Sequence, residues 1–110
     1  MLNLGLYMAQ RLSAMAMGPL VVGHLIVMVV AIQGGLTTGE ILSRTRGSIG
    51  WFLFYGCFVV AVSIHAAIGL RVIVHETSGL RGAWLEAFTW ATGIILLTMG
   101  ARAVMAVTLL

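Results

Sequence analysis

Three long stretches that are almost free of Asp, Glu, Lys and Arg are the feature that most limits how this chain can fold. Two of them cover residues 12–39 and 47–70, and a third runs from residue 87 onward with only Arg102 in it. A helix of about 20 apolar residues crosses a hydrocarbon core about 30 Å thick. The sequence therefore predicts an all-α membrane protein with three transmembrane helices. The predicted spans are residues 14–33, 50–74 and 86–108.

The composition excludes a water-soluble domain. Hydrophobic residues make up 61% of the chain and charged residues 8%, whereas a soluble domain has about a quarter of its residues charged. We therefore expect one domain, 1–110, integral to a lipid bilayer. The net charge of +3 comes from scattered arginines, so nucleic acid is not an expected partner. Cys57 is the one cysteine, which excludes cysteine-based metal and iron–sulfur motifs.

The connections between the spans differ in character. Residues 33–50 are rich in Gly, Ser and Thr and predict an exposed loop, whereas residues 75–83 predict a tight turn. Spans two and three should therefore pack as an antiparallel hairpin. The residues before Arg11, among them Tyr7, predict a short amphipathic segment on the membrane surface rather than part of the first span. Pro19 predicts a tilt or kink in the first helix.

Two histidines lie inside predicted spans, where an ionisable side chain is a functional candidate by default. His24 lies roughly 20 Å along the helix from Arg11, and His65 roughly 9 Å before Arg71. Because consecutive spans run antiparallel, the two histidines sit at different depths and are poorly placed to bind one iron together. Each is a candidate axial ligand of haem b, with its partner imidazole on another helix or chain. The alternative is a hydrogen bond to a neighbouring span.

Two arginines are candidates for holding a cofactor or substrate. Arg71 follows His65 by one and a half turns, which places it near the same helix face, and Arg11 lies on the same membrane side. A guanidinium offers paired donors for haem propionates or a quinone carbonyl. The alternative role for each is that of an anchor reaching the membrane interface. The sequence contains no catalytic triad, phosphate loop, zinc motif or paired carboxylate.

Two segments carry a family resemblance. QRLSAMAMG at the head of the first span and HAAIGLRVIVHE at the end of the second resemble motifs of the cytochrome b membrane-anchor subunits of succinate dehydrogenase and fumarate reductase. Those anchors are short three-span proteins with a motif like H-R-x-S-G before the first helix and one like H-x-x-x-G-[IL]-R-H-x-x-x-D at the end of the second. The resemblance covers most of the chain. Three positions depart from it, occupied here by Gln10, Ala14 and Val72.

The resemblance implies roles for residues at the end of the second span. The family's haem-ligand histidine falls on His65, which makes His65 an expected iron ligand. The glycine of the family's motif falls on Gly69, the motif arginine on Arg71 and the motif acidic residue on Glu76.

It also implies roles for residues of the first span. The family's quinone-site arginine falls on Arg11, with Ser13 on the motif serine, and Tyr7 is counted with them as a quinone-binding candidate. His24 resembles the first-helix ligand of the two-haem members, so we expect it to ligate a second haem iron.

The whole resemblance implies a haem b-binding membrane anchor of a succinate:quinone oxidoreductase. A flavoprotein subunit with FAD would react with succinate or fumarate, and an iron–sulfur subunit would pass electrons to the quinone substrate. This chain would anchor both, bind one or two haems shared with a partner chain and form part of the quinone site. The partner anchor would be a second membrane subunit or a second copy of this chain, in the cytoplasmic membrane of a bacterium. Alone, the chain is expected to catalyse nothing.

Two alternatives stay open on the sequence. Another membrane cytochrome b subunit, such as a hydrogenase-type anchor, would also bind haem but would have a different soluble partner and usually more spans. A haem-free structural or transport subunit would use its glycines for close helix packing and would show no haem absorbance.

Overall fold

A computed structural model describes residues 3–109, and within them the chain is helical with no strand. The prediction of three spans is confirmed. Helices α1 (Leu4–Gly34), α3 (Ile49–Ser78) and α4 (Ala83–Thr108) are each long and apolar enough to cross a membrane. A short fourth helix, α2 (Thr38–Thr45), connects the first two spans.

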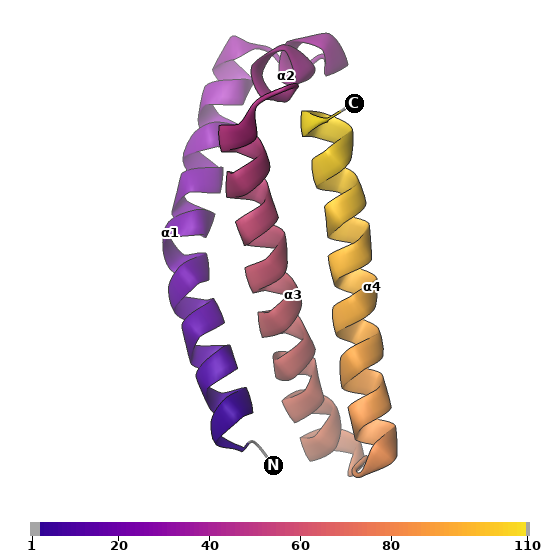
Figure 1. Ribbon diagram of the computed structural model, residues 1–110. Helices are drawn as coiled ribbons and strands as arrows, with labels where there is room; N and C mark the ends of the chain where they lie inside the picture. The colour runs from indigo at the N-terminus through magenta and orange to yellow at the C-terminus, as the bar shows by residue number, and fades with distance from the viewer. Residues whose placement is uncertain (1–2, 110) are drawn as a thin grey trace.

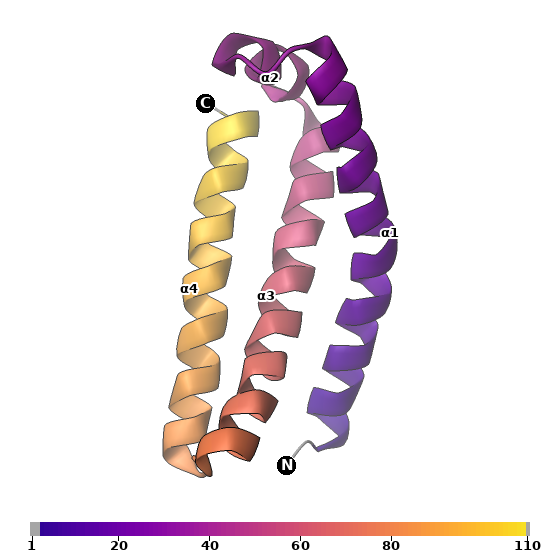
Figure 2. The same cartoon turned by 180° about the vertical axis from the view of Figure 1, so that it is seen from behind.

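The three spans form a row with α3 in the middle. Helix α3 packs against both α1 and α4, and Figures 1 and 2 show α1 and α4 on opposite sides of it. The described N-terminus lies beside the α3–α4 turn, which we name the hairpin end. The C-terminus lies beside α2, which we name the α2 end. A cavity of about 420 Å³ between α3 and α4 also has the first residues of α1 in its wall. Most apolar side chains of α1 face outward.

Helix α1 begins earlier than the sequence analysis predicted. Asn3 caps it, with its side-chain oxygen accepting a hydrogen bond from the Leu6 backbone N–H at 2.8 Å. This cap starts the helix before Arg11, so the residues expected as a separate surface segment are the first turns of the span. The helix then continues through Pro19, which has no N–H for the bond to the preceding turn. Figures 1 and 2 show a gently bowed helix.

The faces that α1 and α3 turn toward each other follow a three–four spacing. Such spacing keeps one stripe of a helix against its neighbour, as in a coiled coil. On α1 the stripe comprises Leu6, Gln10, Ser13, Met17, Leu20, His24, Val27 and Ala31, none of them fully exposed. On α3 it comprises Trp51, Phe54, Phe58, Ala61, His65, Ile68 and Val72. We name this contact the α1–α3 seam.

Helices α3 and α4 form the antiparallel hairpin predicted from the sequence. Gly79 ends α3 in the left-handed region (φ 76°), where its N–H donates to the His75 carbonyl at 3.0 Å. The helices approach most closely at Gly100, where an added Cβ would overlap the Val59 side chain. Glycine is therefore needed at this point of the hairpin.

The first connection is more ordered than the predicted loop. Thr37 caps α2 by accepting a hydrogen bond from the Glu40 N–H at 3.2 Å. The Thr45 hydroxyl then donates to the Val107 carbonyl at 2.7 Å, and the Gly47 N–H donates to the Thr108 carbonyl at 2.6 Å. These bonds hold the end of α4 against the α2 end of the molecule.

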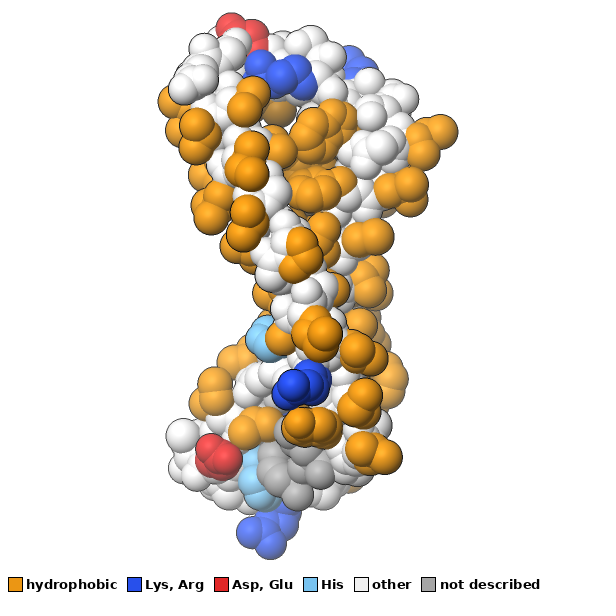
Figure 3. All heavy atoms as spheres, turned by 90° about the vertical axis from the view of Figure 1, so that its left-hand side faces the viewer, with side chains coloured by type: hydrophobic (Ala, Val, Ile, Leu, Met, Phe, Trp, Pro, Cys, Tyr) orange, Lys and Arg blue, Asp and Glu red, His pale blue; other side chains and the backbone are white. Residues whose placement is uncertain are grey.

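The surface is consistent with a bilayer crossing. Figure 3 looks onto the α1 side, where apolar side chains cover most of the surface, charged side chains lie at the top and in the lower part, and one histidine lies just below the middle. Exposed apolar side chains of this kind need lipid or another membrane chain around them. The row therefore stands across the bilayer with its hairpin end and α2 end at opposite interfaces.

The contact at Gly100 gives a first prediction. Gly100→Ala should lower the free energy of unfolding by about 1–3 kcal/mol, because Val59 is stiff and cannot yield without strain. The measurement is the thermal unfolding of the purified, detergent-solubilised protein. Gly18→Ala is the matched control, since nothing lies within 4 Å of a Cβ there. Equal melting temperatures for the two variants would contradict the close contact.

Candidate functional site

The polar side chains of the α1–α3 seam lie at two levels. His65 faces Ser13 toward the hairpin end, whereas His24 packs against Phe58 toward the α2 end. His65 follows Phe58 by seven residues, which is about 10 Å along the helix. The two histidines therefore lie at different depths and cannot share one axial position on a single iron.

The level toward the hairpin end is a cluster of Gln10, Ser13, His65 and Gly69, which we name the Ser13–His65 cluster. Ser13 is 6% exposed, and its hydroxyl donates to the Gln10 carbonyl at 3.0 Å. His65 Nδ1 lies 3.5 Å from the same hydroxyl oxygen. The Gln10 side chain covers Gly69, and its Oε1 is buried without a hydrogen-bond partner among the described residues.

The cluster fits an imidazole that binds iron. A metal-ligating histidine usually donates its other ring N–H to an acceptor, which fixes the ring and its tautomer. His65 has such an acceptor in Ser13 Oγ beside Nδ1, and this leaves Nε2 for a ligand. The half-buried imidazole at membrane depth therefore matches what an axial haem ligand requires.

The level toward the α2 end surrounds His24. Its ring lies edge-on to Tyr55 and Phe58, with centroid separations of 6.1 and 5.5 Å. Nδ1 of His24 is buried and has no hydrogen-bond partner among residues 3–109. A cavity of about 600 Å³ beside the ring is lined by parts of α1, α2 and α3 and includes Arg44 and Trp51. An unpaired buried nitrogen beside such a space indicates a place for a ligand.

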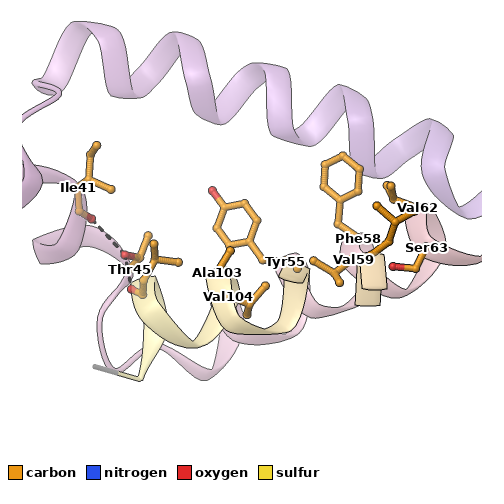
Figure 4. A pocket seen from close by; sticks show the side chains of 12 residues that line it. Ile41, Thr45, Tyr55, Phe58, Val59, Val62, Ser63, Ala103 and Val104 are labelled. Atoms are coloured by element: carbon orange, nitrogen blue, oxygen red, sulfur yellow. Dashed lines mark hydrogen bonds between the residues drawn. The ribbon is translucent and has the colours of Figure 1, made fainter. Parts of the chain in front are cut away.

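Tyr55 separates this space from a second one. A cavity of about 430 Å³ lies between α3 and α4 beneath α2, and Figure 4 shows Tyr55 in its wall with Phe58 and Val59. Tyr55 and Thr45 line both cavities. Their walls are mostly apolar, so the α2 end offers room for lipophilic groups.

Arg71 faces α4 rather than His65. Its Nη2 lies 2.6 Å from Glu86 Oε1, and its Nη1 donates to the Thr89 hydroxyl at 3.2 Å. Six residues turn a helix by about 600°, so Arg71 points about 120° away from His65. The expectation that both share a face is therefore wrong. A spacing of one and a half turns places the two residues close together along the helix axis, but their side chains point in different directions around it.

The sequence analysis did not identify the partners of Arg71. Glu86 stands in the first turn of α4, and Thr89 follows one turn later. A tight turn between two antiparallel helices places residues at similar distances from it opposite each other. This signal was available for Thr89, six residues after the start of α4, because Arg71 lies seven residues before the end of α3. Gln10 was noted only as a departure from a family motif, yet it packs within the Ser13–His65 cluster.

The three quinone candidates divide between two faces of α1. Tyr7 and Arg11 are exposed and four residues apart, so they share one outward face. Ser13 follows Arg11 by two residues, about 200° around the helix, and is buried against α3. The structure therefore brings Tyr7 and Arg11 together and places Ser13 with His65.

The histidines stand singly. Within residues 3–109 no group of three or more His, Cys, Asp or Glu side chains is placed to hold a metal ion.

Comparison with known proteins gives one match. A family model described as succinate dehydrogenase/fumarate reductase transmembrane subunit matches residues 2–101. This range contains every candidate residue described above. Searches of curated proteins and of solved structures gave no match.

The ion pair at the hairpin end gives a second prediction. Glu86→Gln should lower the free energy of unfolding by about 1–3 kcal/mol, because Arg71, 8% exposed, keeps a buried charge without its counter-ion. Arg71→Met should cost less, since the Glu86 side chain is 55% exposed and stays hydrated. Denaturant unfolding in detergent measures both. A larger loss in Arg71→Met than in Glu86→Gln would contradict this asymmetry.

Proposed function

The chain belongs to the succinate dehydrogenase/fumarate reductase transmembrane subunit family, and from this we propose that it is the haem b-binding anchor of a succinate:quinone oxidoreductase. In this role it holds a flavoprotein subunit with FAD and an iron–sulfur subunit at the membrane, here a bacterial cytoplasmic membrane. It also forms part of the quinone site. The family match and the three apolar spans support an integral membrane subunit of such a complex. They favour it over the hydrogenase-type anchor.

The observation that carries the haem proposal is the environment of His65. Ser13 Oγ lies beside Nδ1 of His65, so Nε2 is the nitrogen for iron. When bound, haem b supplies one-electron transfer between the iron–sulfur relay and the membrane. Within residues 3–109 no other histidine lies at this level, so any second protein ligand would come from a partner anchor or a second copy of this chain.

His24 is the proposed ligand of a second haem. The support is its membrane depth, about 10 Å from the level of His65, together with the adjoining cavity of about 600 Å³. The unpaired Nδ1 would then need an acceptor from the partner chain or from water. Arg44 lines the same cavity, and its Nη2 donates to the Gly35 carbonyl at 2.7 Å. Its remaining donors would be available to a propionate.

The quinone site is proposed at the outward face of α1 near the hairpin end. Arg11 and Tyr7 share this face, and Ser13 was grouped with them by the family motif. A guanidinium there donates hydrogen bonds to a quinone carbonyl and stabilises the negative charge that develops as electrons arrive. The iron–sulfur subunit would then dock at this end.

The haem proposal predicts different effects of the two histidines. His65→Ala should remove one low-spin b haem per complex while the chain still inserts and assembles. His24→Ala should leave that haem in place and remove a second one. The measurement is haem per complex together with the optical spectrum of the purified complex. Unchanged haem content in His65→Ala would overturn the assignment of His65, and unchanged content in His24→Ala would overturn that of His24.

The quinone proposal predicts a specific loss for Arg11→Leu. A hydrogen bond to a charged group contributes roughly 1.5–3 kcal/mol, so quinone turnover should fall about ten- to a hundredfold. Dye reduction by the soluble subunits bypasses quinone and should stay normal. Arg81→Leu is the matched control, because Arg81 is exposed in the α3–α4 turn at the same end. Full quinone activity in an intact Arg11→Leu complex would show that Arg11 is only an interfacial anchor.

A further inference from the structure

The hydrogen bonds of Ser13 are constrained by its burial. A buried hydroxyl has one proton to donate and two lone pairs that can accept. Ser13 gives its proton to the Gln10 carbonyl, three residues earlier in α1, at 3.0 Å. While it does so, its oxygen is free to accept from His65 Nδ1, which lies 3.5 Å away on α3. In this arrangement His65 Nδ1–H is the donor and Ser13 Oγ is the acceptor.

We propose that Ser13 is a positioning residue for His65. The proposal rests on the proposed function, in which His65 binds haem iron. Ser13 Oγ holds the proton of the imidazole on Nδ1 and fixes the plane of the ring, so that the Nε2 lone pair points away from the seam. An acceptor at Nδ1–H also increases the basicity of the ligating nitrogen.

The place of Ser13 in the seam favours this role over contact with a quinone. Arg11, which the family motif groups with Ser13, points about 200° away around α1 and is exposed. Ser13 is 6% exposed and covered by α3. Ser13 lines a cavity of about 650 Å³ between α1 and α3, and neither Arg11 nor Tyr7 lines it. A quinone head held by Arg11 on the outward face of α1 would therefore lie on a different side of the helix from the Ser13 hydroxyl.

Through Ser13, the His65 imidazole is also linked to the backbone of α1. Gln10 supplies a helical carbonyl, Ser13 links it to His65, and both residues of α1 lie on the same stripe. The side chain of Ser13 is short, so it has few conformations in which to hold the ring. The imidazole is thereby oriented from α1 although it belongs to α3.

The test compares Ser13→Ala, Ser13→Thr and Ser63→Ala in the purified holo-complex. Ser63 is a serine of α3, 5% exposed, which lines the cavity between α3 and α4 shown in Figure 4. Among the described residues it makes no hydrogen bond to a histidine. The readouts are the rate of haem release to apomyoglobin and the midpoint potential of the haem. Neither readout depends on turnover.

Ser13→Ala should release haem about 10- to 100-fold faster, the usual cost of removing such a partner. Its haem potential should rise, because a less basic imidazole stabilises the ferric state less. Ser13→Thr retains a hydroxyl and should restore most of both properties, and Ser63→Ala should match the unmodified complex.

Other outcomes overturn the inference in distinguishable ways. If His65→Ala loses its haem while Ser13→Ala behaves like Ser63→Ala, the positioning role is wrong and the haem assignment stands. If Ser13→Ala slows quinone turnover with haem release and potential unchanged, Ser13 belongs to the quinone site. If His65→Ala keeps its haem, the proposed function fails and this inference fails with it.

Discussion

The antiparallel contact between α1 and α3 is the interaction on which the rest of the structure depends. Within a bilayer, lipid tails are as apolar as the helices, so helix association relies on close packing and hydrogen bonds rather than on the hydrophobic effect. The α1–α3 seam meets this requirement with a regular stripe that carries Gln10, Ser13 and His24 on one side and His65 on the other. The polar residues that pack α1 against α3 are thus also the candidate functional residues. A change of register by one turn would separate Ser13 from His65 and leave buried polar atoms without partners.

The three spans are arranged openly rather than as a closed three-helix bundle. Helix α3 has neighbours on two sides, whereas α1 contacts α3 and leaves its other faces open. A compact three-helix bundle would enclose His65, but a row leaves its imidazole half-buried at the edge of the seam. Such a row leaves apolar side chains of α1 exposed, against which lipid or further membrane helices can pack. This geometry agrees with the membrane subunit of a larger complex, to which the family match points.

Much of the architecture could be predicted from the sequence, because uncharged runs and apolar length are local properties. The spans, the hairpin and the two depths of the histidines followed from counting residues along helices. The side chain of Arg71 was misplaced because length along a helix was considered without rotation around it. Helix α2 was missed because its Gly and Thr were interpreted as a loop, although Thr37 and Glu40 have the spacing of a capping box. The contact between Ser13 and His65 could not be predicted. The two residues lie 52 positions apart in the chain, and their contact depends on the register between α1 and α3.

The bonds that join α2 to the end of α4 have a consequence for the order of assembly. Thr45 and Gly47 donate to the carbonyls of Val107 and Thr108, which leave the ribosome about 60 residues later. The hydrogen bonds between the α2 end and α4 therefore cannot form until after the first two spans have been made. During this interval the cavity between α3 and α4 beneath α2 lacks its α4 wall. That wall is complete only after the last turns of α4 have been made and can accept the hydrogen bonds from Thr45 and Gly47.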